Sequence, residues 1–327
     1  MKFQLWDLDS LAYARHSLHT ADRSWPESNC YVDLWVELLH TAGADPLAAL
    51  PCTLAVDLEG DQWTFFKFPI ADLGALYGVD VFELNVWQPL TVHLAEQLAL
   101  GRLAIVEVDA FYLPDTAGTS YRCQHVKTSI GIQALDPDDR RLGYFHNAGY
   151  YELAGEDFTG VFRLEGRLID SEFLPPYVEV AKLGNRPRRT GRALVETSLG
   201  MLRAHLARRP VANPFRQYAA RLPADLAWLA GEPASSFHGY AFATLRQCGA
   251  AFELASAYLR WLEAHGECGL EPAAEACERI ATTAKTLQFK AARAVSTRKP
   301  LDPAPSLEAM AAFWDETMRT LTARYCL

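Results

Sequence analysis

Residues 24–42 of the chain read SWPESNCYVDLWVELLHTA. Apolar side chains recur here at helical spacing and predict an amphipathic helix, with the polar Asp33, Glu37 and His40 outside the apolar stripe. The stripe consists of Tyr31, Leu34, Trp35, Leu38, Leu39 and Ala42. Cys30 stands at the head of this helix. A helix start favours a thiolate over a thiol, because unpaired N–H groups and the positive end of the helix dipole lie there.

The reactivity of Cys30 depends on where this helix begins, and two starts are open. A capping box S-x-x-E from Ser24 to Glu27 would begin the helix at Trp25 and leave Cys30 well inside it. An N-cap in the Ser-Asn pair at 28–29 would place Cys30 in the first turn instead. We favour the second start, because a proline and a polar pair fit an entry turn better than a helix interior. The alternative for the cysteine itself is a buried structural thiol.

Length and composition predict a protein that folds without disulfides or bound metal ions to stabilise it. Its 327 residues, half of them apolar, suffice for one large or two ordinary domains. The early Asp7 and Asp9 do not fit a signal peptide, and no apolar run reaches membrane-spanning length, so we expect a cytoplasmic protein without a membrane partner. Seven cysteines without C-x-x-C pairs indicate mostly reduced, buried thiols. The net charge of −9 argues against nucleic acid as a partner.

The first half of the chain mixes helices and strands. A short strand is expected at 53–57, a helix at 89–100, and a buried strand in RLAIVEVDAFYL, residues 102–113. A hairpin follows, in which HVKTSIGIQAL (125–135) and RLGYFHNAGYY (141–151) flank the turn DPDD. This pattern predicts an α+β domain with an antiparallel sheet and a helix that carries the cysteine.

The last third of the chain reads as helical throughout. Helices are expected at 193–208, 236–265, 271–297 and 306–325. The second has a heptad seam that predicts helix-on-helix packing, formed by Leu245, Cys248, Phe252, Ala255, Leu259 and Leu262. The basic stretch KLGNRPRRTGR (182–192) is the best candidate boundary. We therefore predict a domain at 1–185 and an all-helical domain at 186–327.

His125 and Asn147 supply the other two groups of a thiol-enzyme triad. His125 opens the first arm of the hairpin and would act as general base, while Asn147 closes the second arm and would hold the imidazole tautomer. The rival orienter, Asp136, belongs to the turn at the far end of the hairpin. The structural alternatives are a histidine hydrogen-bonded at a strand edge and an ordinary turn asparagine.

Other chemistry is less well supported by the sequence. An oxyanion would need the N–H of Cys30 and a side chain upstream, for which Asn29 and Ser24 are the candidates. Metal binding by Cys123, His125 and His146 is the main chemical rival, but no C-x-x-C or H-x-x-x-H spacing accompanies these residues. No glycine-rich phosphate loop or G-x-S-x-G elbow is present, so nucleotide hydrolysis and serine-esterase chemistry have no support.

Several of these segments resemble a bacterial family of unknown function, of the DUF1839 type. The segments are PESNCYVDLWVELLHTAG (26–43), VDAFYLPDTAGTS (108–120), HVKTSIGI (125–132), FHNAGYY (145–151) and FHGYAFATLRQCGAAFELASAYLRWL (237–262). The resemblance runs over nearly the whole chain. More distantly, the N-terminal half is similar to the papain-like acyltransferase of butirosin biosynthesis, which takes an aminoacyl-type group from an acyl carrier protein to an amine.

This resemblance implies a papain-like N-terminal domain with Cys30 as nucleophile, His125 as base and Asn147 as the third residue. It also implies that Asp109 and Tyr112 line the site. No cofactor is implied, since phosphopantetheine would arrive on the carrier-protein donor. Two departures concern the oxyanion donor and the third residue. The chain has Ser24 where such enzymes commonly have glutamine, and its hairpin is longer than the usual bacterial one.

Acyl or aminoacyl transfer from a carrier-protein thioester to an amine or hydroxyl is therefore the leading expectation. Carrier proteins are usually acidic, so the basic stretch offers docking residues, namely Arg186, Arg188, Arg189 and Arg192. Two alternatives stay open. A cysteine peptidase or amidase would use the same triad with water as acceptor, and a catalytically inert binding module would keep the fold without using the thiol.

Overall fold

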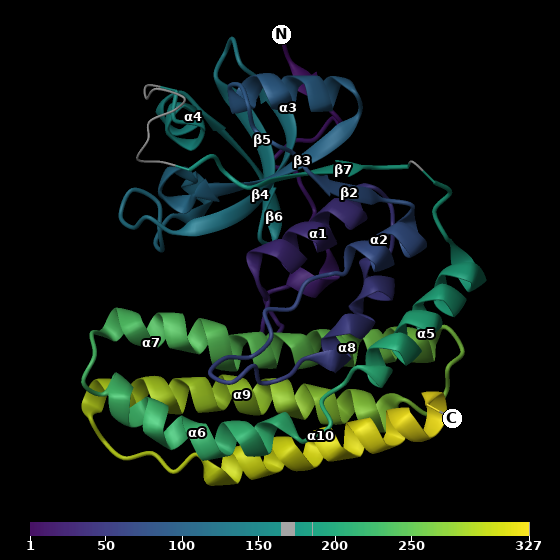
Figure 1. Ribbon diagram of the computed structural model, residues 1–327, viewed down its shortest axis with the longest axis vertical. Helices are drawn as coiled ribbons and strands as arrows, with labels where there is room; N and C mark the ends of the chain where they lie inside the picture. The colour runs from purple at the N-terminus through teal and green to yellow at the C-terminus, as the bar shows by residue number, and fades with distance from the viewer. Residues whose placement is uncertain (165–173, 185, 327) are drawn as a thin grey trace. The chain divides into compact units, whose positions relative to one another are not determined.

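The computed structural model describes residues 1–164, 174–184 and 186–326 (Figure 1). The chain divides into two compact units, each built from segments that are not continuous in sequence. The first unit contains Met1–Thr20, Asn29–Asp45 and Leu73–Arg188, and the second contains Ala21–Ser28, Pro46–Asp72 and Arg189–Leu327. The sequence predicted continuous domains at 1–185 and 186–327, whereas the two units interleave; residue 185 itself lies outside the described residues.

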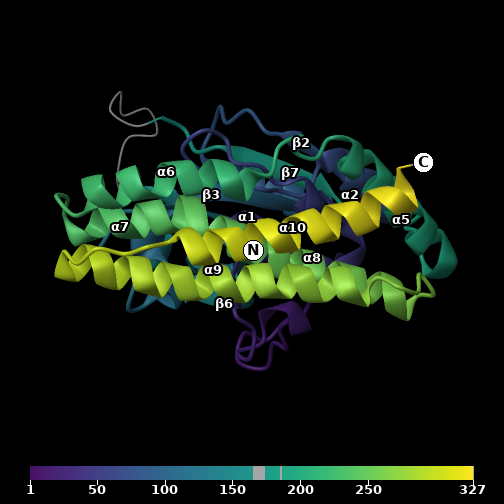
Figure 2. The same ribbon diagram turned by 90° about the horizontal axis from the view of Figure 1, so that it is seen from below.

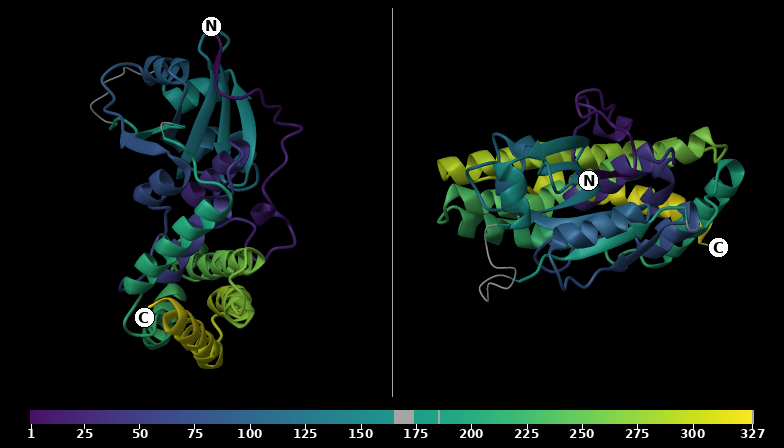
Figure 3. Two further views of the ribbon diagram at one scale, coloured as in Figure 1. Left: turned by 90° about the vertical axis from the view of Figure 1, so that its right-hand side faces the viewer. Right: turned by 90° about the horizontal axis from the view of Figure 1, so that it is seen from above.

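An antiparallel sheet forms the centre of the first unit (Figures 1 and 3). Its strands follow the order β2-β7-β3-β4-β5-β6, and the short β1 pairs with β4. The strands are β1 (Phe3–Gln4), β2 (Asp80–Glu83), β3 (Arg102–Asp109), β4 (Lys127–Asp136), β5 (Arg141–His146), β6 (Gly149–Ala154) and β7 (Val178–Lys182). The predicted hairpin is confirmed as β4 and β5, and the predicted buried strand as β3. The α+β class with an antiparallel sheet is thus confirmed.

Helices cover both faces of this sheet. On one face lies α1 (Cys30–Thr41), which Gly131 of β4 allows to approach closely: a Cβ atom at residue 131 would lie 2.7 Å from Cδ1 of Leu34. On the other face, α3 (Leu90–Ala99) and α4 (Glu156–Phe162) share an apolar cluster with the sheet. The cluster includes Leu94, Leu98, Val106, Ile130, Ile132, Phe158 and Phe162. The helix predicted at 89–100 is confirmed as α3.

Short helical turns complete the first unit. They are the 3-10 helices η1 (Ser17–His19), η3 (Ala110–Tyr112) and η4 (Pro114–Thr116). Helix α2 (Ile70–Tyr77) spans the point at which the chain passes from the second unit into the first. The turns η3 and η4 follow directly from the end of β3 and bring the chain back to the start of β4.

The second unit is helical, as predicted. Its elements are η2 (Pro46–Ala55), α5 (Gly191–Ala207), α6 (Pro214–Leu229), α7 (Ala234–Ala241), a π-helical turn η5 (Phe242–Arg246), α8 (Gln247–Ala264), α9 (Glu271–Thr297) and α10 (Ala304–Tyr325). The four helices expected here are confirmed, with the segment 236–265 divided by the π-helical turn. Helix α6 was not predicted. Figure 2 shows α6, α8, α9 and α10 running side by side, in agreement with the packing of α8 on α9, α9 on α10 and α10 on α6.

The predicted heptad seam is confirmed. Its six residues in η5 and α8 are buried, and α8 packs along α9. Such a seam stabilises the bundle because each apolar side chain leaves water on packing against the facing helix. Within the described ranges, no helix combines the length and the apolarity needed to cross a membrane.

The strand expected at 53–57 is wrong, because the 3-10 helix η2 occupies most of this segment. Two hydrogen bonds show why the helical form is stable. Oγ1 of Thr53 donates to the carbonyl of Leu50 at 2.7 Å, and Oγ of Ser198 in α5 donates to the carbonyl of Ala48 at 2.8 Å. The segment also packs against α5 and α8. Local apolar composition could not distinguish a strand from a helix packed among other helices.

Replacement of Gly131 by alanine tests the close approach of α1 to the sheet. The added methyl group must displace the fully buried Leu34, so we expect Gly131→Ala to lower the free energy of unfolding by about 1–3 kcal/mol in urea titrations. Gly200→Ala, in α5 with nothing within 4 Å, is the matched control and should be neutral or stabilising. An unchanged unfolding midpoint for Gly131→Ala would contradict the packing described here.

Candidate active site at the start of helix α1

Cys30 is the first residue of α1, as the second of the two predicted starts requires. The side-chain oxygen of Asn29 accepts a hydrogen bond from the N–H of Val32 at 3.0 Å and caps the helix. The capping box that would have begun the helix at Trp25 is therefore not used. The thiol is half-buried and lies in the first turn, where the helix dipole is positive.

His125 is held by Asp109. Its Nδ1 lies 2.5 Å from Oδ2 of Asp109, and the imidazole stacks on the ring of Phe111 with centroids 4.4 Å apart. The other carboxylate oxygen, Oδ1, accepts the N–H of Phe111 at 3.0 Å and caps η3. One carboxylate thus fixes both the turn and the imidazole. Because Nδ1 is engaged, Nε2 is the nitrogen that can exchange a proton with a ligand.

The Asp109–His125 pair belongs to the sheet face that α1 covers. Gly131 contacts α1, and Ile105 lies opposite Gly131 in the sheet. Alternation along β3 puts Glu107 and Asp109 on the same face as Ile105. A second ion pair supports this placement, since Nζ of Lys127 lies 2.7 Å from Oε1 of Glu107. The face on which α1 packs therefore also carries two neighbouring charge pairs, in which the side chains of His125 and Lys127 are exposed.

The orienting contact predicted for Asn147 is wrong, because Asp109 makes it. Asn147 lies in the turn between β5 and β6 with φ 45°, a conformation that asparagine tolerates. Phe145 pairs with Gly131, so the strand register places residue 147 level with Ser129. His125 precedes Ser129 by four residues, which is roughly 13 Å in an extended strand. The rival Asp136 pairs with Arg141 at the far end of the hairpin, as expected.

Tyr112, which the resemblance implied as a site-lining residue, packs on the other side of the sheet. It lies against the apolar cluster of that face, and its ring is so close to Gly160 of α4 that a Cβ there would lie 2.1 Å from Cδ1. Asp109, the other residue implied in this way, instead contacts the histidine directly. The sequence therefore identified the right segment but did not distinguish its two faces.

His146, which the sequence offered only as a metal ligand, is buried on that other face. Nδ1 of His146 is 2.5 Å from Oδ2 of Asp115, and Nε2 is 2.8 Å from Oγ1 of Thr128. All three side chains are buried. Both ring nitrogens of His146 are thus engaged, on the face away from His125, so the metal site considered for Cys123, His125 and His146 is not assembled. Among the described residues, no cluster of three or more potential ligands fits a metal ion.

The contacts that the structure shows for the remaining candidates are with residues other than Asp109 and His125. Ser24 belongs to the second unit, where its N–H donates to Oε1 of Glu253 at 2.9 Å. The four docking arginines divide between the units at Arg188 and Arg189. Arg192 pairs with Glu196 in the next turn of α5 at 2.7 Å, an exposed contact that contributes little to stability.

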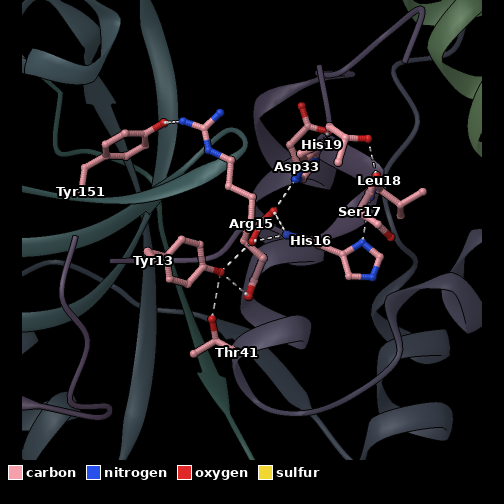
Figure 4. A network of polar contacts seen from close by, with 11 residues as sticks. Tyr13, Arg15, His16, Ser17, Leu18, His19, Asp33, Thr41 and Tyr151 are labelled. Atoms are coloured by element: carbon pink, nitrogen blue, oxygen red, sulfur yellow. Dashed lines mark hydrogen bonds and ion pairs between the residues drawn. The ribbon is translucent and has the colours of Figure 1, made fainter. Parts of the chain in front are cut away.

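A buried polar network fastens the N-terminal segment to α1 (Figure 4). Its centre is Glu37, whose carboxylate accepts hydrogen bonds from the hydroxyl of Tyr13 at 2.6 Å and the N–H of His16 at 3.0 Å, and also contacts Nδ1 of His19. Nε2 of His19 lies 3.4 Å from Oδ1 of Asp33. Asp33 and Glu37 lie outside the apolar stripe of the helix, yet both are buried. The N-terminal segment covers them and supplies their partners.

The network holds a cation between two carboxylates. Burial alone would lower the pKa of His19, but its hydrogen bonds to Asp33 and Glu37 outweigh burial and raise that pKa from 6.5 to about 9. Burial alone would raise the pKa of Glu37, but the hydrogen bond and charge of His19 outweigh it and lower that pKa. At neutral pH the two side chains therefore form a buried ion pair.

The seven cysteine thiols differ in how far they are buried, and the buried ones have a raised pKa. Cys52, Cys248 and Cys277 are fully buried, and burial raises the pKa of each above its usual value, to about 12 for Cys52 and Cys277. These three thiols are inert by that criterion. Cys123, Cys268 and Cys326 are exposed, and only Cys30 combines partial exposure with a helix start among the described cysteines.

The His19 ion pair predicts a pH dependence of stability. Because the pKa of His19 is raised in the folded protein, its contribution is complete below pH 6.5 and is lost as the pH rises through about 9. Over that range we expect the wild-type free energy of unfolding to fall by on the order of 3 kcal/mol more than that of His19→Gln, measured in urea at each pH. Parallel losses in the two proteins would show that His19 does not carry this charge.

Comparison with known families covers both halves of the chain. The DUF1839 N-terminal domain matches residues 14–183, a range that includes Cys30, Asp109 and His125, and the DUF1839 C-terminal domain matches residues 191–323. No curated protein is similar enough to the chain to count as a match. The resemblance of the sequence to this family is confirmed. The chain belongs to the DUF1839 family, with one domain of the family in each half.

Proposed function

We propose that this protein transfers an acyl or aminoacyl group from a carrier-protein thioester to an amine or hydroxyl, through an acyl-enzyme on Cys30. One observation carries the proposal: Cys30 begins the helix that packs on the same sheet face as the Asp109–His125 pair. A thiol at a helix start, a histidine at a strand start and a carboxylate that fixes the imidazole are the parts of a thiol-enzyme triad. The proposal includes a papain-like fold for the first unit.

The reaction runs in two halves. Sγ of Cys30 gives its proton to Nε2 of His125 and attacks the thioester carbonyl carbon, and the carrier thiol leaves with that proton. The acceptor nitrogen or oxygen then attacks the acyl-enzyme, and its proton passes through His125 back to Sγ. Both steps require Cys30 and His125 to come within hydrogen-bond reach in the complex. Thioester exchange suits a cysteine because the donor and the acyl-enzyme are close in energy.

Two further roles complete the proposed mechanism: one residue orients His125, and an N–H group binds the oxyanion. Asp109 fixes the tautomer of His125 through Nδ1 and stabilises the imidazolium that forms in each half. The backbone N–H of Cys30 is the proposed oxyanion donor. The side-chain oxygen of Asn29 accepts the N–H of Val32, so the donor that this side chain would offer is its amide N–H₂ group, and Asn29 stays a candidate donor beside the N–H of Cys30.

The carrier protein is the proposed partner, and it would bring the acyl group on its phosphopantetheine arm. Arg189 and Arg192 are exposed near the start of α5 and fit an acidic surface. Association steered by such charges slows as ionic strength rises, because salt screens exposed charges over about 10 Å at 0.1 M. A salt-insensitive rate of acylation would argue against docking through these arginines.

Intact-mass spectrometry tests the acyl-enzyme. The exposed Cys123, Cys268 and Cys326 are first replaced by serine, so that Cys30 is the only thiol left that is not buried. Incubation with an aminoacylated carrier protein should add one acyl mass, and Cys30→Ala should abolish the adduct. An adduct that decays at the same rate with or without an amine would indicate a hydrolase. No adduct with any thioester would leave the binding module as the function.

A variant pair tests the role of Asp109. Asp109→Asn keeps the shape but removes the charge that fixes His125, so we expect acylation of Cys30 to slow by ~10²–10⁴-fold. Glu107→Gln is the matched control, because Glu107 lies two residues away on the same strand face and pairs with Lys127 instead. Rates come from quenched time points by mass spectrometry. Equal slowing of the two variants would mean that general surface charge, rather than the His125 contact, matters.

A further inference from the structure

A cavity of about 440 Å³ lies in the first unit beside the C-terminal half of α1, the end of the helix away from Cys30. Trp35, Leu38 and Leu39 of α1 line it. Small-molecule sites typically have volumes of about 300–1,000 Å³. The cavity, called here the α1 C-terminal cavity, is therefore large enough to hold a ligand, and nothing in the proposed acyl transfer uses it.

The inner wall of the α1 C-terminal cavity is apolar. Trp6, which follows β1, and Tyr77 and Val79, which flank the end of α2, complete the wall begun by α1. The hydroxyl of Tyr77 donates to the carbonyl of Asp45 at 2.6 Å, so its polar atom is engaged. The rings and aliphatic side chains of this wall favour a ligand whose body is a hydrocarbon chain or ring.

Two arginines lie at this cavity. Nη1 of Arg188 donates to the carbonyl of Ala42, the C-cap of α1, at 2.6 Å, which fixes the guanidinium at the helix end. A guanidinium has five N–H donors, so one such contact leaves it able to bind an anion as well. Arg186 is exposed. Its Nη2 lies 3.6 Å from Oδ1 of Asp80, a distance at which a surface ion pair is weak.

The backbone positions Arg186 firmly. Gly78 has φ 68°, and a Cβ atom there would lie 2.2 Å from the carbonyl oxygen of Arg186. Only a glycine permits this close contact between the segment after α2 and the segment after β7. A helix C-terminus by itself repels an anion, because its dipole is negative. The charge of the two arginines reverses that preference and makes the cavity mouth a place for an anionic group.

We propose that the α1 C-terminal cavity binds a small amphiphilic anion. The hydrocarbon body lies against Trp6, Trp35 and Leu38, and a carboxylate or phosphate group lies on Arg186 and Arg188. The anionic group and the apolar body are both required, because the body fills the space along the apolar wall and the anion neutralises the two arginines. This site is separate from Cys30, and the inference does not rest on acyl transfer.

Isothermal titration calorimetry on the full chain tests the proposal with four probes: decanoate, decyl phosphate, decanol and inorganic phosphate. We expect one equivalent of decanoate or decyl phosphate to bind, with decanol and inorganic phosphate at least 10-fold weaker. The stronger of the two anions identifies the headgroup. Equal affinities for decanoate and decanol would overturn the role of the arginines, and binding of inorganic phosphate as tightly as decyl phosphate would overturn the role of the cavity.

Variants separate the two parts of the site. The double variant Arg186→Gln, Arg188→Gln should weaken the anionic probes at least 10-fold and leave decanol unchanged. Arg189→Gln with Arg192→Gln is the matched control, since neither arginine lines the cavity, and it should leave the affinity for each of the four probes unchanged. Leu38→Trp should fill the cavity and abolish binding of every decyl probe. An unchanged affinity in the Arg186, Arg188 variant would refute the proposal even if Leu38→Trp fails to fold.

Cys30→Ala distinguishes this proposal from the acyl transferase. The α1 C-terminal cavity lies at the other end of the helix, so Cys30→Ala should bind decanoate and decyl phosphate as the wild type does. Loss of binding in Cys30→Ala would contradict an independent site. Failure of every acylation experiment would leave this binding result unaffected.

Discussion

The carboxylate of Glu37, buried in the middle of α1, is the constraint on which the first unit depends. A buried and unpaired carboxylate would destabilise the fold strongly, so its partners must be in place whenever α1 packs on the sheet. They come from a segment that precedes the helix, through Tyr13, His16 and His19. The path of the N-terminal segment is therefore set by the chemistry of one helix residue, and the position of α1 is set in turn.

Everything proposed for function follows from the position of α1. Its twelve residues span roughly 18 Å, with Cys30 at the start and Ala42 just after the end. Gly131 brings Leu34 and Leu38 of the helix close to the sheet. The Asp109–His125 pair lies at the strand ends on the α1 face, and Arg188 lies at the C-cap. One helix thus serves a chemical site and a cavity.

Local features of the sequence were sufficient for most elements. Three features depend on residues that are close in the sequence: the Asn29 cap, the hairpin turn and the heptad seam. They could therefore be predicted from the sequence alone. The pairing of His125 with Asp109, the burial of Glu37 and the His146–Asp115 contact depend on segments 16 to 31 residues apart. Such contacts follow from strand register and chain path. The periodicity of apolar residues along the sequence cannot predict such contacts. The 3-10 helix η2 was missed for a different reason, because its stability comes from packing within the second unit.

The interleaving of the two units has a consequence for how the protein can be made and divided. The chain alternates between the units through six segments, so no single cut yields both units complete. A fragment that ends near residue 185 would contain η2 without α5 and α8, the helices it packs against. During synthesis η2 leaves the ribosome more than a hundred residues before α5 and α8. Its apolar side chains therefore cannot pack against these helices until the helices have been synthesised. The boundary between the two family domains, which falls between residues 183 and 191, therefore does not separate the two units.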